Sequence, residues 1–257
     1  MAEWNAEVYA RISAPQLEWG KRVLARLPLA GDETVLDAGC GAGRLTRLLL
    51  ARLPRGRVVA LDASEAMLVK ARELLAPSGD QVSFVRADLA THAERPPVDA
   101  IFSTATFHWV LDHDALFDRL RESLRPGGLL AAQWGADGNL TRIRRRTAAL
   151  RESAAFRAYF SDFREPWLYV TAEETRGLLE SRGFVRVQVW REAAPARFDE
   201  AGYREFVTHV ILRDDLARLP DDAARSLFVE ALVDEARRDD PPFELDYWRL
   251  NADAARG

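Results

Sequence analysis

The sequence predicts an α/β fold in which helices flank a parallel β-sheet. Short apolar runs alternate with helix-like segments through the first two thirds of the chain, and the first run leads into a loop with glycines at positions 39, 41 and 43. Parallel strands need long crossover connections, usually helices, so this alternation indicates βαβ units with right-handed crossovers. Such sheets bind ligands outside the carboxyl ends of their strands, which is where the glycine loop falls.

Five segments have the character of successive strands. The first and fourth are apolar runs, the fourth of the kind found in buried strands, whereas the third alternates between polar and apolar residues. The predicted strands cover residues 34–38, 57–62, 81–88, 98–104 and 129–134.

Helices are predicted between these strands, because apolar side chains recur there every three or four residues. The first covers residues 43–53, directly after the glycine loop. Ser64 has the position and residue type of an N-cap for the second helix. A further helix follows the "DHD" of residues 112–114, and we expect the Pro-Gly-Gly of residues 126–128 to end it.

The last third of the chain has a different pattern, with long helical stretches separating two late strands. A helical stretch of about forty residues is too long for an ordinary connection. We therefore expect a single domain in which two helical segments cover the ligand end of the sheet. The core is predicted at about 15–137, 171–190 and 243–254, and the helical cover at 138–160 and 198–239, split near Leu219-Pro220.

Composition excludes several classes of protein. The 257 residues carry a formal net charge of -4 and 48 % hydrophobic residues. A mildly acidic chain lacks the basic footprint of a nucleic-acid-binding protein. The single cysteine, Cys40, excludes an internal disulfide framework, and no apolar run is long enough for a membrane span. We expect a cytoplasmic protein, a monomer or homodimer, with neither nucleic acid nor membrane as a partner.

The loop in "VLDAGCGAGRLT", residues 35–46, is the first candidate site. A strand, a glycine loop and a helix together offer a ligand backbone N–H groups and a helix N-terminus. The spacing is G-x-G-x-G, and Arg44 stands where a dinucleotide fingerprint has its last glycine. No G-K-[ST] follows, so a P-loop is excluded. A tight turn without a ligand is the alternative.

Three carboxylates accompany this loop at the ends of successive strands. Asp37 precedes the loop, Asp62 ends the second strand, and Asp88 ends the third. A carboxylate at position 62 can accept hydrogen bonds from both hydroxyls of a ribose. One at position 88 can accept a hydrogen bond from the amino group of an adenine. We expect the three to lie on the ligand side of the sheet and to converge with the loop amides on one ligand.

Four motifs along the chain together resemble those of a known family. The stretches "VLDAGCGAGRLT", "VVALDAS", "VRADL" and "LRPGGLLAAQW" resemble, in order, those of class I S-adenosylmethionine-dependent methyltransferases over roughly residues 33–135. The resemblance implies a Rossmann-like, seven-stranded, mostly parallel sheet with a reversed last hairpin. It also implies S-adenosylmethionine as cofactor and S-adenosylhomocysteine as product. The implied cofactor-binding residues are Asp37, Ala38, Gly39, Gly41, Asp62, Ala63, Met67, Asp88, Leu89 and Ser103.

A narrower resemblance concerns the methyl acceptor. The stretches "WNAEVY", "FHWVLDH" and "YWRLNA" are similar to the trans-aconitate methyltransferase group, although the residues after the first depart from that group's usual pattern. This favours a small-molecule acceptor with a carboxylate or another oxygen. A carbon or nitrogen acceptor of secondary metabolism, a silent cofactor-binding module and a nucleotide-linked oxidoreductase are the alternatives.

Methyl transfer from a sulfonium mainly requires alignment and exclusion of water, and a base only for an acceptor that must lose a proton. His108 is the candidate base or substrate contact, and a histidine hydrogen-bonded at a strand end is the plain alternative. Tyr9 is a second catalytic candidate, in an N-terminal flap with Trp4. The predicted substrate-binding residues are Trp4, His108, Trp109, Trp134 and His209, with Tyr203 and Phe206 beside His209.

Three further features favour plain interpretations. His108, His113, Asp112 and Asp114 match no metal-ligand spacing, so we predict no metal site. Nothing near Cys40 in the sequence would activate it as a nucleophile. The basic cluster "RIRRR", residues 142–146, is expected to be a solvated helix face, with an anion-attracting wall as the alternative.

Overall fold

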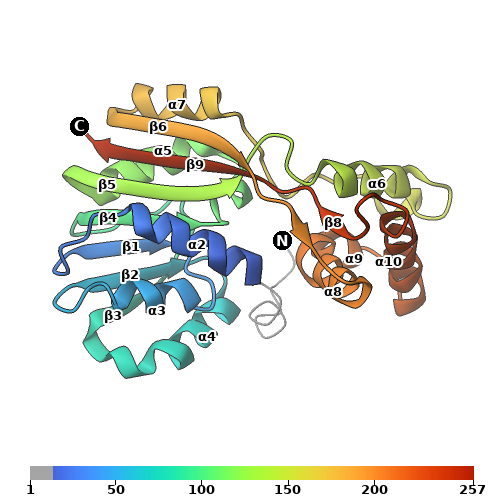
Figure 1. Ribbon diagram of the computed structural model, residues 1–257, viewed down its shortest axis with the longest axis horizontal. Helices are drawn as coiled ribbons and strands as arrows, with labels where there is room; N and C mark the ends of the chain where they lie inside the picture. The colour runs from blue at the N-terminus through green and yellow to red at the C-terminus, as the bar shows by residue number, and fades with distance from the viewer. Residues whose placement is uncertain (1–13) are drawn as a thin grey trace. The chain divides into compact units, whose positions relative to one another are not determined.

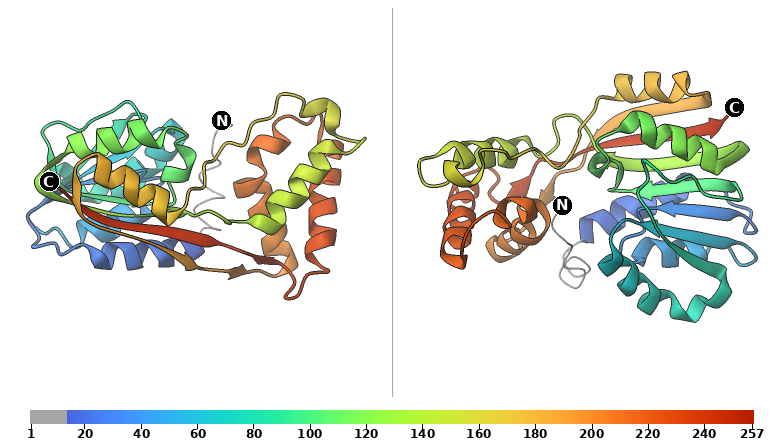
Figure 2. Two further views of the ribbon diagram at one scale, coloured as in Figure 1. Left: turned by 90° about the horizontal axis from the view of Figure 1, so that it is seen from above. Right: turned by 180° about the vertical axis from the view of Figure 1, so that it is seen from behind.

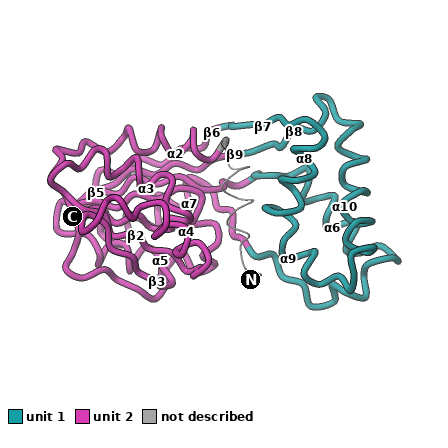
Figure 3. The backbone as a smooth tube through the Cα atoms, turned by 90° about the horizontal axis from the view of Figure 1, so that it is seen from below, with its two compact units in different colours: residues 1–12, 138–166, 193–248 teal, residues 13–137, 167–192, 249–257 magenta. Residues whose placement is uncertain are grey.

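The computed structural model describes residues 14–257, so Trp4 and Tyr9 lie outside the described residues. The described chain divides into two compact units, each with its own core (Figure 3). The sheet unit consists of residues 14–137, 167–192 and 249–257, and the helical unit of residues 138–166 and 193–248. The two segments predicted as a helical cover belong in sequence to the helical unit.

The sheet unit contains the predicted seven-stranded, mostly parallel sheet (Figure 1). The strand order is β3-β2-β1-β4-β5-β9-β6, and β9 runs antiparallel to β5. The predicted bounds of the first, second and fourth strands are confirmed to the residue. The strands are β1 Thr34–Ala38, β2 Arg57–Asp62, β3 Val82–Arg86, β4 Val98–Thr104, β5 Leu124–Gly135, β6 Phe184–Ala193 and β9 Trp248–Arg256.

Helices cover both faces of this sheet, as Figures 1 and 2 show. One face carries α2, α3 and α4, whose buried leucines, valines and alanines form one cluster with the apolar residues of β1, β2, β4 and β5. The other face carries α5 and α7. The bounds are α2 Ala14–Arg26, α3 Arg44–Leu50, α4 Glu65–Leu75, α5 His113–Ser123 and α7 Ala172–Ser181, with short 3₁₀ turns η1 Ala76–Gln81 and η2 Phe107–Trp109.

Side-chain caps set where several helices begin. The predicted cap Ser64 accepts a hydrogen bond from the Met67 amide, and Asp112 does the same for the Ala115 amide. The prediction that residues 126–128 end the helix is wrong. Helix α5 already ends at Ser123, and β5 begins at Leu124, so the Pro-Gly-Gly lies within β5, where its pairing with β4 is irregular.

The helical unit is built from short helices and one two-stranded sheet. Its core combines aliphatic and aromatic side chains, and Phe156 and Phe160 pack there against Phe228 of α10. None of the described helices is both long and apolar enough to cross a bilayer. The elements are α6 Thr141–Glu152, η3 Arg157–Tyr159, β7 Ala196–Arg197, α8 Glu200–Phe206, the π-helical turn η4 Val207–Ile211, α9 Arg213–Leu216, α10 Asp222–Ala236 and β8 Glu244–Leu245.

Two expectations about this unit need correction. Arg146 is bound by both oxygens of Asp239, and Arg142 donates to Glu244 at 3.0 Å, so the basic cluster is neither simply solvated nor a bare anion-attracting wall. Tyr203 and Phe206 are fully buried, and burial raises the pKa of the Tyr203 hydroxyl to about 12. They are core residues because α8 turns its apolar face into the helical unit.

Candidate functional site

The glycine loop requires glycine at 39 and 41 for different reasons. Gly39 has φ +89°, and a Cβ there would stand 2.1 Å from the Thr106 hydroxyl oxygen. The loop is drawn close to β2 because the Gly39 and Cys40 amides both donate to the Leu61 carbonyl. At Gly41 φ is +54°, yet an added Cβ would meet no atom within 4 Å. Packing against Thr106 therefore requires glycine at position 39. At position 41 only the left-handed backbone favours glycine, and the space where a side chain would stand is open.

Asp62 ties this loop to the end of β2. Its Oδ2 accepts the Gly41 N–H at 2.8 Å, and its Oδ1 accepts the Ser64 N–H at 2.9 Å. Burial raises the pKa of the Asp62 carboxyl, and the same backbone donors oppose that rise. Each oxygen keeps a second lone pair after accepting one hydrogen bond, so the carboxylate can also accept bonds from a ligand.

Asp88 lies beside Asp62 at the same edge of the sheet. The Asp62 carbonyl accepts a hydrogen bond from the Ala87 amide, one residue before Asp88. The Asp88 side chain is exposed and accepts the Ala90 N–H at 2.8 Å. The structure thus brings the two acidic residues together at the carboxyl ends of β2 and β3. The neighbouring predicted residues are Met67 and Leu89, both buried, and Ala63, which is exposed.

Asp37 is the third acidic residue, and it is buried beneath the loop. Its Oδ2 accepts the Thr46 hydroxyl at 2.7 Å, which connects β1 to α3. Burial raises the pKa of its carboxyl to about 7, with a further contribution from the charge of Asp62. Burial likewise raises the pKa of the Cys40 thiol well above its usual value, so the thiol stays protonated.

Ala38 and Ser103 join the first and fourth strands. The Ser103 hydroxyl donates to the Ala38 carbonyl at 2.6 Å, and both residues are buried. The hydroxyl is therefore committed to holding the two strands together. The loop after β4 then turns through Ala105, which has φ 54°, and places Thr106 against Gly39.

His108 sits in η2, directly after this turn. The Gly135 amide at the end of β5 donates to His108 Nδ1 at 3.3 Å, so Nδ1 is the acceptor and Nε2 carries the proton. Burial lowers the pKa of His108 well below its usual range, and the positive charge of Arg249 lowers it further. The ring is therefore a neutral hydrogen-bond donor near physiological pH.

Two aromatic rings pack against His108, and a third packs against both of them. The ring centroids of Trp109 and Tyr169 lie 5.1 Å and 5.8 Å from that of His108. Trp167 contacts both, and it stacks on Tyr169 with an interplanar angle of 18°. The backbone holds the segments together, because the Leu168 amide donates to the His108 carbonyl at 2.8 Å. Sequence reasoning missed Trp167 and Tyr169, which are about sixty residues away along the chain.

Of the other predicted substrate-binding residues that the structure describes, Trp134 belongs to the sheet unit and His209 to the helical unit. Trp134 is fully buried and packs against Phe107 and Phe117, on the face of the sheet that α5 covers. Trp134 is therefore a core residue of the sheet unit. His209 is half-buried on η4 in the helical unit.

Sequence reasoning also missed a buried polar row on the opposite face. Gln133 and Asn251 are cross-strand partners on β5 and β9, and Gln133 Nε2 donates to Asn251 Oδ1 at 2.9 Å. Arg249 Nε approaches Gln133 Oε1 at 3.4 Å, and Arg249 is only 3 % exposed. The alternation of polar and apolar residues in the last strand, with Arg249, Asn251 and Asp253 at every second position, was the available signal in the sequence.

Comparisons with known proteins give these features a family. Residues 35–128 match the family model described as a methyltransferase domain. The chain is 36 % identical over 181 residues to the trans-aconitate 2-methyltransferase of Methylobacterium nodulans, covering 67 % of this chain and 69 % of that protein. It is 31 % identical over 246 residues to the enzyme of that name from Rhodopseudomonas palustris, covering 88 % and 90 % of the two chains. The match to the Azoarcus enzyme, at 41 % identity, spans about half of each.

Solved structures show the same fold. Phosphoethanolamine N-methyltransferase 2 of Haemonchus contortus, in complex with S-adenosyl-L-methionine, superposes with a TM-score of 0.63 at 18 % identity, covering 98 % of this chain and 56 % of that one. The YcgJ protein of Bacillus subtilis gives the same score at 16 % identity, covering 93 % and 98 %. The chain therefore belongs to the class I S-adenosylmethionine-dependent methyltransferases, within which it is similar to the trans-aconitate 2-methyltransferases.

Proposed function

We propose that this methyltransferase acts on a carboxylate oxygen of a small polycarboxylate similar to trans-aconitate. The names of its relatives support this acceptor class. The observation that carries the proposal is the hydrogen bond from the Gly135 amide to His108 Nδ1. A carboxylate acceptor has no proton to lose, and it needs donors and positive charge rather than a base. His108 offers a donor.

The residues at the glycine loop fit an adenosyl amino acid. Asp62 would accept the ribose hydroxyls while it holds the loop, and Asp88 would accept the adenine amino group. The open space at Gly41 and the buried carboxyl of Asp37 suit the amino-acid end. The cofactor, when bound, supplies an electrophilic methyl group on its sulfonium.

His108 and the rings around it would prepare the acceptor. The Nε2–H would donate to one carboxylate oxygen and so would orient the lone pair of the oxygen that accepts the methyl group. The rings of Trp109, Trp167 and Tyr169 keep water away from that oxygen, and a less hydrated carboxylate is a better nucleophile. Alignment of this kind contributes about 7–11 kcal/mol in well-oriented reactions.

Two measurements test the proposal. Calorimetry should show S-adenosylhomocysteine binding at micromolar concentration. Incubation with S-adenosylmethionine and a panel containing trans-aconitate, an amine and a phenol should yield a methyl ester of the acid, detected by mass spectrometry. Methylation of the amine or phenol alone would overturn the carboxylate proposal. Cofactor binding without methylation of any acceptor would favour the silent module.

Gly41→Ala tests the fit of the cofactor to the loop. The added Cβ meets no protein atom, so the variant should lose only about 1–2 kcal/mol of folding stability from its left-handed backbone. It should bind S-adenosylhomocysteine roughly tenfold or more weakly, because the methyl group fills the space that the ligand needs. Calorimetry and urea unfolding measure the two effects. Unchanged affinity in the folded variant would place the cofactor elsewhere.

His108→Gln and His108→Ala together separate a donor from a base. A glutamine can present an N–H near the position of Nε2, so H108Q should keep most of the kcat, whereas H108A should lose roughly 10- to 100-fold. The pH dependence of kcat/KM near pH 6.5 should be the same in the wild-type protein and in H108Q. His108 does not titrate in that range, because its pKa lies well below pH 6.5. Equal loss in both variants would instead indicate a base.

Two further predictions complete the proposal. We expect a cytoplasmic location and a monomer or a homodimer. Gel filtration with light scattering measures the second.

A further inference from the structure

We infer that Arg249 is a specificity-determining residue that binds a second carboxylate of the acceptor, so that polycarboxylates are preferred over monocarboxylates. The inference rests on the proposed carboxylate acceptor and goes beyond it, because it explains which carboxylic acids are chosen. Four features of the sheet unit support it.

The first feature is the position of Arg249 in the sheet. Strand β9 runs antiparallel to β5, and Arg249 at its start pairs with Gly135 at the end of β5. Arg249 therefore lies at the carboxyl edge of the parallel strands, the edge that also carries Gly41 and Asp62. Gly135 is the residue whose amide binds His108. Gly135 is thus both the cross-strand partner of Arg249 and the hydrogen-bond donor to His108.

The second feature is a chain of hydrogen bonds that orients the guanidinium. Arg26 of α2 donates to Asp253 at 2.9 Å and to Asn251 Oδ1 at 2.8 Å. Gln133 Nε2 donates to the same Asn251 oxygen, which turns Gln133 Oε1 toward Arg249 Nε. A guanidinium held through Nε has a fixed plane, and a planar guanidinium of fixed orientation can bind a carboxylate through two hydrogen bonds.

The third feature is the surface beneath the guanidinium. The Arg249 guanidinium carbon lies 4.8 Å from the centroid of the Trp19 ring, and Trp19 is buried in α2. This contact restricts the guanidinium plane and keeps water from one face of it. Because Arg249 is 3 % exposed, its attraction for an anion is screened by solvent far less than at the surface.

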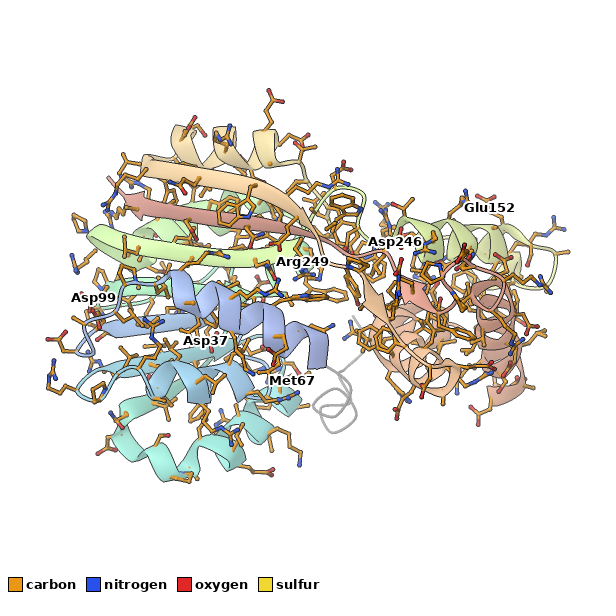
Figure 4. All side chains as sticks on the ribbon, viewed as in Figure 1. Asp37, Met67, Asp99, Glu152, Asp246 and Arg249 are labelled. Atoms are coloured by element: carbon orange, nitrogen blue, oxygen red, sulfur yellow. The ribbon has the colours of Figure 1, made fainter. Side chains whose placement is uncertain are left out.

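The fourth feature is the electrostatic contact between Arg249 and His108. The positive charge of Arg249 is one cause of the lowered pKa of His108, so its field reaches the imidazole. The same field acts on any anion that accepts the His108 Nε2–H. Two carboxylates of one molecule can therefore be held by two different groups, one at His108 for methylation and one at Arg249. Figure 4 shows Arg249 at the same end of the sheet unit as Met67, with Asp99 at the other end.

A series of acids tests the inference by binding alone. The probes are trans-aconitate, fumarate and crotonate, which carry three, two and one carboxylates; fumarate and crotonate share a four-carbon trans-alkene skeleton, and trans-aconitate is fumarate with an added carboxymethyl group. Calorimetry is done on wild type and Arg249→Met saturated with S-adenosylhomocysteine. Wild type should bind trans-aconitate about 100-fold more tightly than crotonate, and R249M should reduce that ratio to about threefold or less. Arg249→Lys should give an intermediate ratio, because an ammonium keeps the charge and loses the planar fork.

Arg256→Met is the matched control. Arg256 lies on the same strand, ~23 Å from Arg249 along β9, and donates to the Leu124 and Arg121 carbonyls at the opposite edge. R256M should change stability but leave the ratio between the acids unchanged. The affinity for S-adenosylhomocysteine should stay within about threefold in all the variants, which also shows that they are folded.

The outcomes separate the two proposals. A wild-type protein that binds and methylates crotonate as well as trans-aconitate overturns the inference about Arg249 and leaves the carboxylate proposal standing. An unchanged ratio in folded R249M and R249K overturns it as well. A wild-type protein that binds none of the three acids overturns the proposed acceptor class and the inference with it. If R249M does not fold, the ratio in R249K decides.

Discussion

Replacing Asp62 by alanine is expected to abolish measurable binding of S-adenosylhomocysteine. The substitution removes the acceptor of the proposed ribose bonds and also releases the Gly41 and Ser64 amides, which the carboxylate holds at 2.8 and 2.9 Å. Two lost hydrogen bonds to a charged group correspond to about 3 kcal/mol or more, which is at least a 100-fold rise in Kd. Calorimetry at increasing ligand concentration measures the loss.

Asp99→Ala is the control for this experiment. Asp99 also accepts a backbone amide, from Thr34 at 2.8 Å, and it binds Arg125. It lies at the amino end of β4, the opposite edge of the sheet from Asp62. D99A should therefore lose stability comparably and keep the wild-type affinity for the ligand. Equal affinities of D62A and wild type would refute the assignment of the ribose to Asp62.

The sheet could be predicted from sequence because its signals are local. The apolar runs of β1, β2 and β4 are bounded by polar residues, and each strand is buried on both faces, so their bounds follow from hydropathy. The side chain of Ser64 caps its own helix three residues ahead, which is again a local interaction. Pro126 misled the prediction, because it marks an irregular strand rather than a helix end.

The acceptor side of the site could be predicted only in part. His108 was found because it lies in the loop just past the end of β4. Trp167 and Tyr169 reach it from a segment about sixty residues later, and Arg249 from the last strand, so only the fold brings them together. No periodicity encodes such contacts. The tautomer of His108 could not be predicted from sequence either, because it is set by a hydrogen bond from the Gly135 amide at the end of the neighbouring strand β5.

Asp37 should make folding stability fall as pH rises through neutrality. Burial raises the pKa of its carboxyl from 3.8 to about 7, so the folded protein binds this proton more tightly than the unfolded chain does. The stabilisation is complete below the unfolded pKa and is lost as pH rises through the folded pKa. Between pH 5 and pH 8 the loss should be about 2–3 kcal/mol, at roughly 1.4 kcal/mol per pH unit. Urea unfolding at several pH values measures it.

Asp37→Asn isolates this group from the other carboxyls whose pKa values burial also raises, such as Asp215 and Asp253. An asparagine can still accept the Thr46 hydroxyl, as Asp37 Oδ2 does at 2.7 Å, and it does not ionise. The variant should be the more stable protein at pH 8, and the difference from wild type should vanish or reverse at pH 5. In the wild-type protein, affinity for S-adenosylhomocysteine should rise with pH, because ionised Asp37 attracts the ammonium group of the ligand. In the variant this rise in affinity should be absent. Parallel stability curves for the two proteins would mean that Asp37 is already ionised well below neutrality, and that burial does not control its charge.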